Sequence, residues 1–435
     1  MSRRGEQSGP VALLTKLGWV LSGPVNTSCG GEPTCTTNLN TTHVLQIDVI
    51  PVQREPDEDL KEQLKKFWDL ETIGIRNDEK SVYDNFIEEV QFNGERYEAK
   101  LPFKEHHPLL PDNHAASVKR LGSLIRRLQD KPTLLREYDN IIQEQIHSGI
   151  VEPVHPRSAV KAGSVHYLPH REVVRTDKNT TKIRVVYDAS AKSTGPSLND
   201  CLYAGPSLTP LIFDILLRFR VHPIAIVADI EKAFLNIAIA PEHRDFLRFL
   251  WVDDPFSKTP MTQLLRFTRV VFGVTSSPFI LNATLRHHVN RYLAEDPEFV
   301  QELLRSLYVD DYASGSESVS SALELSRKIK HRLATGGFNM RKWLTNSTEL
   351  MEVFQTDPEF VESSQNPQPR SPTAEEDQGY TQSVLGDKVD VYPQILGQAW
   401  DTRTDKFVID LDKVIADIDP NVVTKRMVLC RCKVL

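Results

Sequence analysis

The sequence has few cysteines, no long apolar run and no surplus of positive charge. Its five cysteines in 435 residues are too few and too scattered for a disulfide framework, and Cys430 and Cys432 lack the further ligands of a zinc site. No stretch approaches the about 20 apolar residues of a membrane span, and the apolar segment 11–21 carries Lys16 and no cleavage site. We therefore expect free thiols and no membrane partner. The net charge of −7 is not that of a typical nucleic-acid binder, so such a function would depend on local charge.

Composition and periodicity predict an α+β protein with an antiparallel sheet flanked by helices. Apolar residues make up 40% and charged residues 26%, as in ordinary globular proteins, and the length allows two or three domains. Apolar residues at helical spacing predict helices within 59–70, 130–149 and 316–337. In the second of these, Asp130 is placed to cap the helix, Pro132 suits its first turn and Gly149 suits its end.

Other segments follow strand, hairpin or loop patterns. β-branched runs between breakers predict strands at 182–190 and 222–230. Residues 392–411 predict a hairpin. Residues 356–390 are acidic and rich in Pro, Ser and Gln, which predicts a disordered loop.

The segment "SLYVDDYASG" (306–315) places two acids at the end of a short apolar run. Leu307 to Val309 have strand-forming side chains, and we expect the strand to end at Ala313–Gly315. Because neighbouring strand residues point to opposite faces, either Asp310 or Asp311 must turn inward.

A third acid, Asp229, closes the run "IAIVA" in the same way. If the two strands are neighbours, three carboxylates meet at one end of a sheet and repel by about 4 kcal/mol per pair. Such a cluster must bind protons or cations, and two Mg²⁺ ions held about 4 Å apart support in-line phosphoryl transfer. The alternative is a simple turn at Asp310–Asp311 and a helix cap at Asp229.

The order of further motifs resembles that of a reverse transcriptase. The matching strings are "KIRVVYDASAK" (182–192), "VADIEKAF" (227–234), "FGVTSSPF" (272–279), "YVDD" (308–311), "GGFNMRKW" (336–343) and "ILGQAWD" (395–401). They are similar to a fingers motif, four palm motifs and a primer-grip hairpin. This resemblance implies an RNA-directed DNA polymerase with a right-hand fold.

Details of the strings are similar to BEL/Pao-type LTR retrotransposon polyproteins. They include "SLNDCLYAGPSL" (197–208), "FGVTSSPFILNATL" (272–285) and the upstream segment 96–128. The resemblance runs from about residue 12 nearly to the C-terminus. It implies the following divisions: a protease remnant and linker at 1–45, a helical pre-polymerase segment at 46–150, fingers at 151–222, palm at 223–355, the acidic loop at 356–390, and the primer grip with a truncated thumb at 391–435.

The resemblance also implies a role for each matching residue. Asp229, Asp310 and Asp311 would be the catalytic acids and, with the Ile230 carbonyl, would hold two Mg²⁺ ions, for which Mn²⁺ can substitute. Phe234 matches the steric gate against ribonucleotides. Arg184, assisted by Lys182, would contact the triphosphate, although Arg184 also reads as a strand-edge surface charge. The nucleotide would further contact Phe272 and Gly273.

Lys342 is a candidate general acid for the pyrophosphate leaving group, or simply a solvated lysine beside Arg341. The implied partners are a primer on an RNA or DNA template and deoxynucleoside triphosphates. Residues 157–184 carry seven Lys/Arg against two Asp/Glu, a strip that could hold phosphates or be merely solvated. The oligomeric state stays open. The resemblance implies an intracellular location, in a cytoplasmic particle.

The sequence departs from the family pattern at both ends. "KLGWVLSGPV" (16–25) resembles the last strand of the family's aspartic protease, but no Asp-Thr-Gly or Asp-Ser-Gly occurs, so we expect no protease activity. The thumb pattern fades near residue 424, which would reduce processivity. Two alternatives therefore stay open: an inactive relic that at most binds nucleic acid, and another two-metal enzyme such as a nuclease.

Overall fold

A computed structural model describes residues 2–4, 11–15, 18–22, 78–154, 163–177, 180–361 and 392–408. The chain divides into two compact units, 1–66 and 67–435. In the first unit, three strands form an antiparallel sheet in the order β1-β2-β3, with β1 at Ser2–Arg4, β2 at Val11–Thr15 and β3 at Gly18–Ser22. The helix predicted within 59–70 lies outside the described residues.

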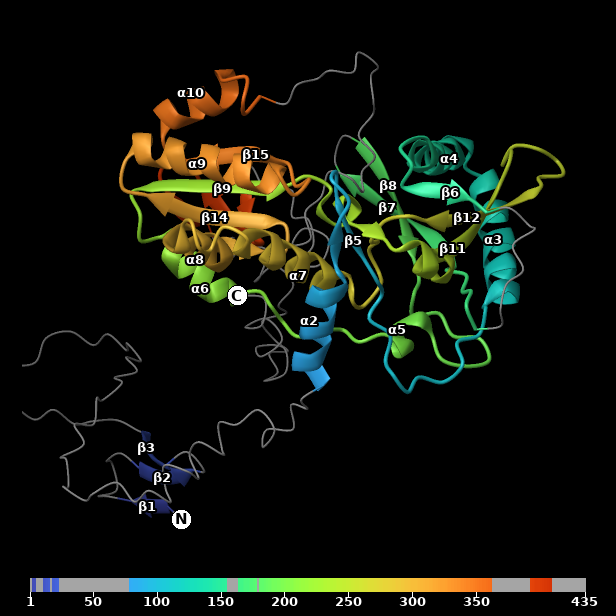
Figure 1. Ribbon diagram of the computed structural model, residues 1–435, viewed down its shortest axis with the longest axis horizontal. Coiled ribbons are helices and arrows are strands. Elements are labelled where there is room, and N and C mark those ends of the chain that lie inside the picture. Colours follow the sequence, from blue (N-terminus) through green and yellow to red (C-terminus); the bar gives the residue numbers. More distant parts are fainter. Residues whose placement is uncertain are drawn as a thin grey trace, which may run out of the picture. The chain divides into compact units, whose positions relative to one another are not determined.

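The second unit is an α+β structure whose central sheet has the order β13-β14-β9-β15 (Figure 1). Its strands are β9 (Ile224–Ile230), β13 (Leu307–Tyr308), β14 (Asp311–Ser316) and β15 (Met340–Thr345), and all pairings between them are antiparallel. The strand predicted at 222–230 is confirmed as β9.

Alternation along β9 assigns the two faces of this sheet to different cores. Ile226, Ala228 and Ile230 join the main core, in which helix α9 (Val319–Ala334) packs on the sheet. Ala225 and Val227 face the opposite way, into a smaller core with helix α6 (Ile212–Phe219) and the 394–408 hairpins. Because side chains alternate, Asp229 continues the face of Ala225 and Val227.

Helices surround the central sheet. They are α7 (Ser277–Asn290), α8 (Pro297–Ser306) and α10 (Thr348–Thr356), besides α6 and α9. The C-terminal described segment forms β16 (Gln394–Ile395), β17 (Gln398–Asp401) and β18 (Lys406–Val408), so the hairpin predicted at 392–411 is in fact a three-stranded meander. Trp400, which is fully buried, packs against Phe219 of α6 and anchors this meander.

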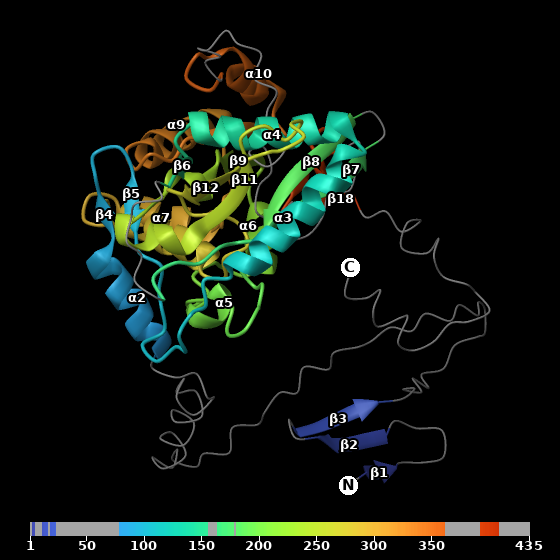
Figure 2. The same ribbon diagram turned by 90° about the vertical axis from the view of Figure 1, so that its right-hand side faces the viewer.

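The other half of this unit carries smaller sheets and two long helices (Figure 2). Its helices are α2 (Asp78–Glu89), α3 (His114–Gln129), α4 (Pro132–His147) and α5 (Leu198–Cys201). Its strands are β4 (Gln91–Phe92), β5 (Tyr97–Ala99), β6 (Val151–Pro153), β7 (His170–Asp177), β8 (Thr180–Tyr187), β10 (Ala238–Ile239), β11 (Arg248–Val252) and β12 (Thr262–Phe267). Two 3₁₀ segments, η1 (Ala233–Asn236) and η2 (Pro241–Leu247), join β9 to β11.

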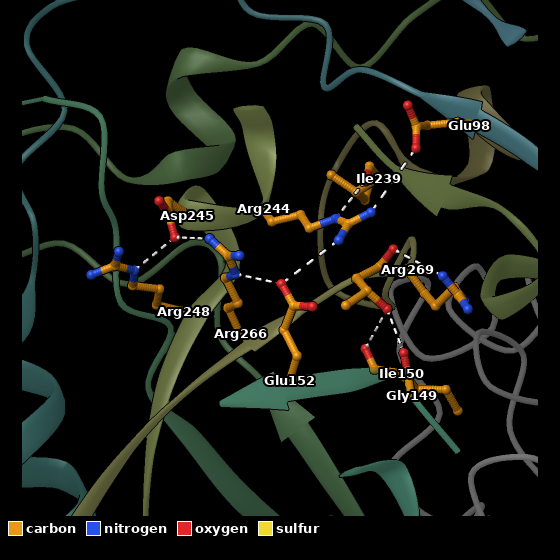
Figure 3. A network of polar contacts seen from close by, with 11 residues as sticks. Glu98, Gly149, Ile150, Glu152, Ile239, Arg244, Asp245, Arg248, Arg266 and Arg269 are labelled. Carbon is orange, nitrogen blue, oxygen red and sulfur yellow. Dashed lines mark hydrogen bonds and ion pairs between the residues drawn. The ribbon is translucent and has the colours of Figure 1, made fainter. Parts of the chain in front are cut away.

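A network of arginines and carboxylates fastens η2 to β6 and β12 (Figure 3). Arg266 donates to Glu152 and to Asp245, each at 2.7 Å, and Arg248 donates to the same Asp245 oxygen at 2.9 Å. Burial opposes ionisation of Asp245, but the hydrogen bonds from Arg248 and Arg266 outweigh it and hold its pKa below the ordinary value. The network therefore couples three segments that are distant in sequence.

Several local predictions are confirmed and others are wrong. Helix α4 begins at Pro132, and Gly149 follows its end with φ +68°, as predicted. Asp130, however, terminates α3 and does not cap α4, whose preceding residue is Lys131. Among the described helices, none is long and apolar enough to cross a membrane.

The other wrong predictions concern segment ends. The predicted strand end at Ala313–Gly315 is wrong, because β14 continues to Ser316 in a full antiparallel pairing with β9. The predicted disordered loop begins too early, because Phe360 is buried against Trp343 and Phe354. The rest of that loop, 362–391, lies outside the described residues, as do residues 409–435, in which the start of a thumb is predicted.

Candidate active site

The pairing of β9 with β14 brings the predicted acids together at one end of the central sheet. Asp229 lies directly opposite Asp311 in the antiparallel register. The Ile230 N–H donates to the Asp310 carbonyl at 2.7 Å, so the neighbouring pair Asp229–Asp311 is of the non-hydrogen-bonded kind. Cβ atoms in such pairs are about 4.5–5.5 Å apart and on the same face. Asp229 and Asp311 thus meet, but not through the predicted pairing: the strand predicted at Leu307–Val309 forms β13, which pairs with β14, and it is β14, beginning at Asp311, that pairs with β9.

Asp310 sits in a strained two-residue turn. Tyr308 pairs with Asp311, which leaves Val309 and Asp310 as the loop between β13 and β14. Val309 has φ +57°, a conformation that glycine usually supplies at this loop position and that costs a β-branched residue about 1–3 kcal/mol. Asp310 is only 4% exposed, whereas Asp311 is half-buried, so Asp310 is the acid that turns inward. Strain of this kind collects at functional sites.

Two cations from β15 reach one of these carboxylates, that of Asp229. Lys342 Nζ lies 3.3 Å from Oδ2 of Asp229, and Arg341 Nε lies 3.8 Å from the same oxygen. Lys342 can do so because it occupies the irregular step of β15 between Arg341 and Leu344, with φ +52°. Arg341 also contacts Glu231 at 3.4 Å. The ammonium of Lys342 thus belongs to the carboxylate site and is not merely solvated.

The donor set at this strand end suits a hard cation. Asp229, Asp310 and Asp311 offer carboxylate oxygens, and Ile230 is the adjacent residue whose carbonyl could join them. Within the described parts of the chain, no three His, Cys, Asp or Glu side chains are gathered into a metal-binding arrangement. Instead, Asp229 is engaged by Lys342 and Arg341. The backbone and donor chemistry fit Mg²⁺, while the side chains are arranged for charge pairing.

Phe234 and Phe272 form an aromatic pair at the start of η1. Phe234 is 2% exposed, and its ring centroid lies 4.5 Å from that of Phe272 in an edge-to-face arrangement. Phe272 is 39% exposed, so the accessible aromatic surface of the pair belongs to Phe272. Phe234 is the buried member of the pair and packs against the Phe272 ring.

The backbone conformation and the close packing at Gly273 both require glycine at this position. Its φ is +91°, and a Cβ would lie 2.6 Å from the Tyr187 carbonyl. The Asn199 side chain holds the same turn, since it donates to the Gly273 carbonyl at 3.0 Å and accepts from the Thr275 N–H at 2.8 Å. The predicted role of Gly273 toward a nucleotide stays a prediction.

The two residues predicted to contact a triphosphate, Arg184 and Lys182, lie on the β7–β8 hairpin. Arg184 pairs with Val173 and is half-buried, whereas the side chain of Lys182 is outside what the structure describes. Of the basic strip 157–184, residues 157–162 and 178–179 are also outside the described range. The contacts of Arg184 and Lys182 with a triphosphate stay predictions.

Sequence reasoning missed three residues of this region. Arg341, Glu231 and Asn199 make the contacts given above, but each is a common polar residue whose partner is distant in sequence. The sequence offered one indication for two of them: Glu231 follows Ile230 and Arg341 precedes Lys342, both of which are predicted site residues.

Comparisons with known proteins add little beyond this geometry. No protein-family model and no curated protein matches the sequence. Among solved structures, the chain is similar to a foamy viral protease–reverse transcriptase determined in complex with an RNA/DNA hybrid, with a TM-score of 0.36 and 16% identity. The match covers 65% of this chain and 30% of that one, so this chain spans less than a third of its length.

Proposed function

We propose that this chain is a nucleotidyltransferase, the RNA-directed DNA polymerase domain of a BEL/Pao-type retroelement. The observation that supports this most directly is the register of β9 and β14, with Asp229 opposite Asp311 and Asp310 in the intervening turn. Carboxylates at the end of neighbouring strands are what two-metal phosphoryl transfer requires. The order of the surrounding motifs adds fingers and primer-grip residues that a nuclease would not need.

Each residue near the acids has a proposed task. Asp229, Asp310 and Asp311, with the Ile230 carbonyl, would hold Mg²⁺, which activates a primer hydroxyl and stabilises the leaving oxygen when bound. Lys342 holds a proton beside Asp229 and could deliver it to the pyrophosphate. Arg184 would pair with triphosphate oxygens. Phe272, supported by Phe234, would form the apolar wall beside the sugar.

A second candidate is a non-catalytic nucleic-acid binder. The observation in its favour is that Lys342 and Arg341 already compensate Asp229 in this structure. In that case the acids would serve as partners of these two cations and not as metal ligands.

Primer extension on an RNA template with Mg²⁺ and deoxynucleotides separates the two. We expect incorporation by the wild type, its loss in Asp310→Asn, and no change in Glu324→Gln, which removes an exposed carboxylate of α9. Equal incorporation by the wild type and Asp310→Asn would refute the catalytic assignment. Binding of primer–template without extension by either protein would favour the non-catalytic candidate, and a shortened primer would indicate a nuclease.

A further inference from the structure

Helix α6 is apolar on all sides, although only one of its faces is buried. Its sequence, IFDILLRF, contains two charged residues and is otherwise apolar. Ile215 and Phe219 are fully buried in the smaller core. The opposite face leaves Phe213 69% exposed and Leu217 54% exposed, and Val221, just past the helix end, is 71% exposed. A helix that is hydrophobic all round is normally covered on every side.

The three exposed residues form one continuous strip. Phe213, Leu217 and Val221 are spaced four residues apart, which places them above one another along the helix. Val221 continues the last turn, because its N–H donates to the Arg218 carbonyl at 3.0 Å. Eight residues of helix correspond to a length of about 12 Å. We call these three residues the α6 stripe. Contiguous exposed apolar surface marks an interaction site, whereas single exposed side chains do not.

The border of the α6 stripe is basic. Arg218 donates to the Arg305 carbonyl at 2.6 Å, which joins α6 to the end of α8 (Figure 1). In the part of the chain that the structure describes, neither arginine has a carboxylate within 4 Å, and Nε of Arg218 is buried without a hydrogen-bond partner. Asp214, the acidic residue of α6, is exposed and forms no ion pair with Arg218. The stripe therefore lies beside two positive charges that described carboxylates do not compensate.

The β16–β18 meander brings the chain to α6. Phe407 of β18 stacks on Phe219 with ring centroids 6.1 Å apart, and Asp405 pairs with Arg220 at 2.6 Å. The description ends one residue later, at Val408. Three further residues span at most about 10 Å. The segment that follows β18 therefore starts within reach of the C-terminal end of α6.

Residues 409–419 lie outside the described range, and their sequence, IDLDKVIADID, predicts a short amphipathic helix. Asp410 is placed to cap such a helix, and Pro420 is placed to end it. Eight helical residues, 411–418, would be about 12 Å long, the same length as the α6 stripe. Apolar residues recur at positions i, i+3, i+4 and i+7, and these are Leu411, Val414, Ile415 and Ile418.

The charges of this segment also suit the α6 stripe. With 3.6 residues per turn, Lys413 falls on the face away from the apolar residues. The four aspartates border the apolar face, two on each side: Asp410 and Asp417, and Asp412 and Asp419. An apolar face bordered by carboxylates is complementary to an apolar stripe bordered by arginines. A helix this short is unstable alone in water, so it needs such a surface to form.

We propose that residues 410–419 form an acidic helix that packs along the α6 stripe and fastens the β16–β18 meander to α6. Its apolar residues cover Phe213, Leu217 and Val221, and its aspartates pair with Arg218 and Arg305. A segment tethered this closely has an effective concentration of about millimolar, which favours it over a second copy of the chain at micromolar concentration. This contact lies outside the carboxylate site and does not depend on the polymerase assignment.

Hydrogen–deuterium exchange of the full chain, read by mass spectrometry over residues 409–419, tests the contact. Wild-type amides there should exchange at least about tenfold more slowly than an unstructured peptide. Leu217→Asp and Ile415→Asp should each abolish this protection, because each places a carboxylate in the apolar contact. Two matched controls should keep it: Leu293→Asp, at a 45% exposed leucine before the start of α8, and Ala416→Asp, on the opposite face of the segment. Unchanged exchange in the buried helix α9 shows that each variant is folded.

The result depends on which surface covers the stripe. Protection that is independent of protein concentration, is lost in both variants and is kept in both controls supports the proposal. Unprotected amides in the wild type overturn it, as does protection that survives Leu217→Asp. Protection that rises with protein concentration, together with a dimer mass by light scattering, would show that a second copy covers the stripe, and this also overturns it. The measurement needs no catalytic activity, so its outcome is independent of primer extension.

Discussion

Lys342 Nζ lies 3.3 Å from Oδ2 of Asp229, and Lys342 reaches it from a backbone conformation that lysine rarely adopts. In an unbroken antiparallel register this residue would lie opposite Ala228, on the face of the sheet away from the Asp229 side chain. The irregular step after Arg341 therefore places a proton-bearing group at the acids, at a cost of about 1–3 kcal/mol in backbone strain.

Lys342→Gly should separate strain from chemistry. Glycine accepts φ +52° without cost, so we expect an equal or higher free energy of unfolding. Nucleotide incorporation should fall by about 10²–10⁴-fold if Lys342 is a general acid. Mg²⁺ should bind more tightly, because the ammonium beside Asp229 is gone. Denaturant unfolding, single-turnover incorporation and calorimetry measure the three effects. Lys342→Arg serves as the charge-retaining control, and full activity of the glycine variant would exclude the role.

Phe234→Val should relax discrimination between deoxyribose and ribose. Replacing the buried Phe234 ring by the smaller valine side chain leaves space into which the Phe272 ring can move. The site then has room for a 2′-hydroxyl. We expect the preference for deoxynucleotides to fall about 10- to 200-fold in competitive incorporation assays. Phe272→Ala is the comparison. If only Phe272→Ala changes the preference, the exposed ring is the gate, and if neither does, the aromatic pair has no such role.

The sequence predicted the elements whose signals are local. Strand β9, helix α9 and the Pro132 start of α4 followed from periodicity and from the conformational limits of proline and glycine. The meeting of Asp229 with Asp311 was conditional on strand order, which no local pattern determines. The contacts of Lys342 and Arg341 could not be foreseen, because they depend on an irregularity within β15.

Asp245→Asn should destabilise the fold by about 1–3 kcal/mol, since Arg248 and Arg266 would lose the charge of their shared acceptor and Arg248 is buried. The lowered pKa of Asp245 means that its contribution exists above the unfolded pKa of about 3.9 and is lost as pH falls through the folded value. Denaturant unfolding at pH 7 and pH 3 measures this. The difference between wild type and variant should shrink at pH 3, whereas Asp130→Asn, at an exposed position, should match the wild type at both.

His170 should make the protein sensitive to mild acid. Burial lowers its pKa to about 4, against the hydrogen bond from Nε2 to the Leu250 carbonyl at 2.8 Å. With that proton on Nε2, Nδ1 accepts from the Tyr138 hydroxyl, so the folded site accommodates the neutral ring. The unfolded state takes up its proton first, near pH 6.5, and stability should therefore fall by about 3 kcal/mol between pH 6.5 and 4. His170→Gln keeps a donor for Leu250 but does not titrate. Its stability should fall less steeply over the same range, and parallel curves for the two proteins would show that His170 is not the cause.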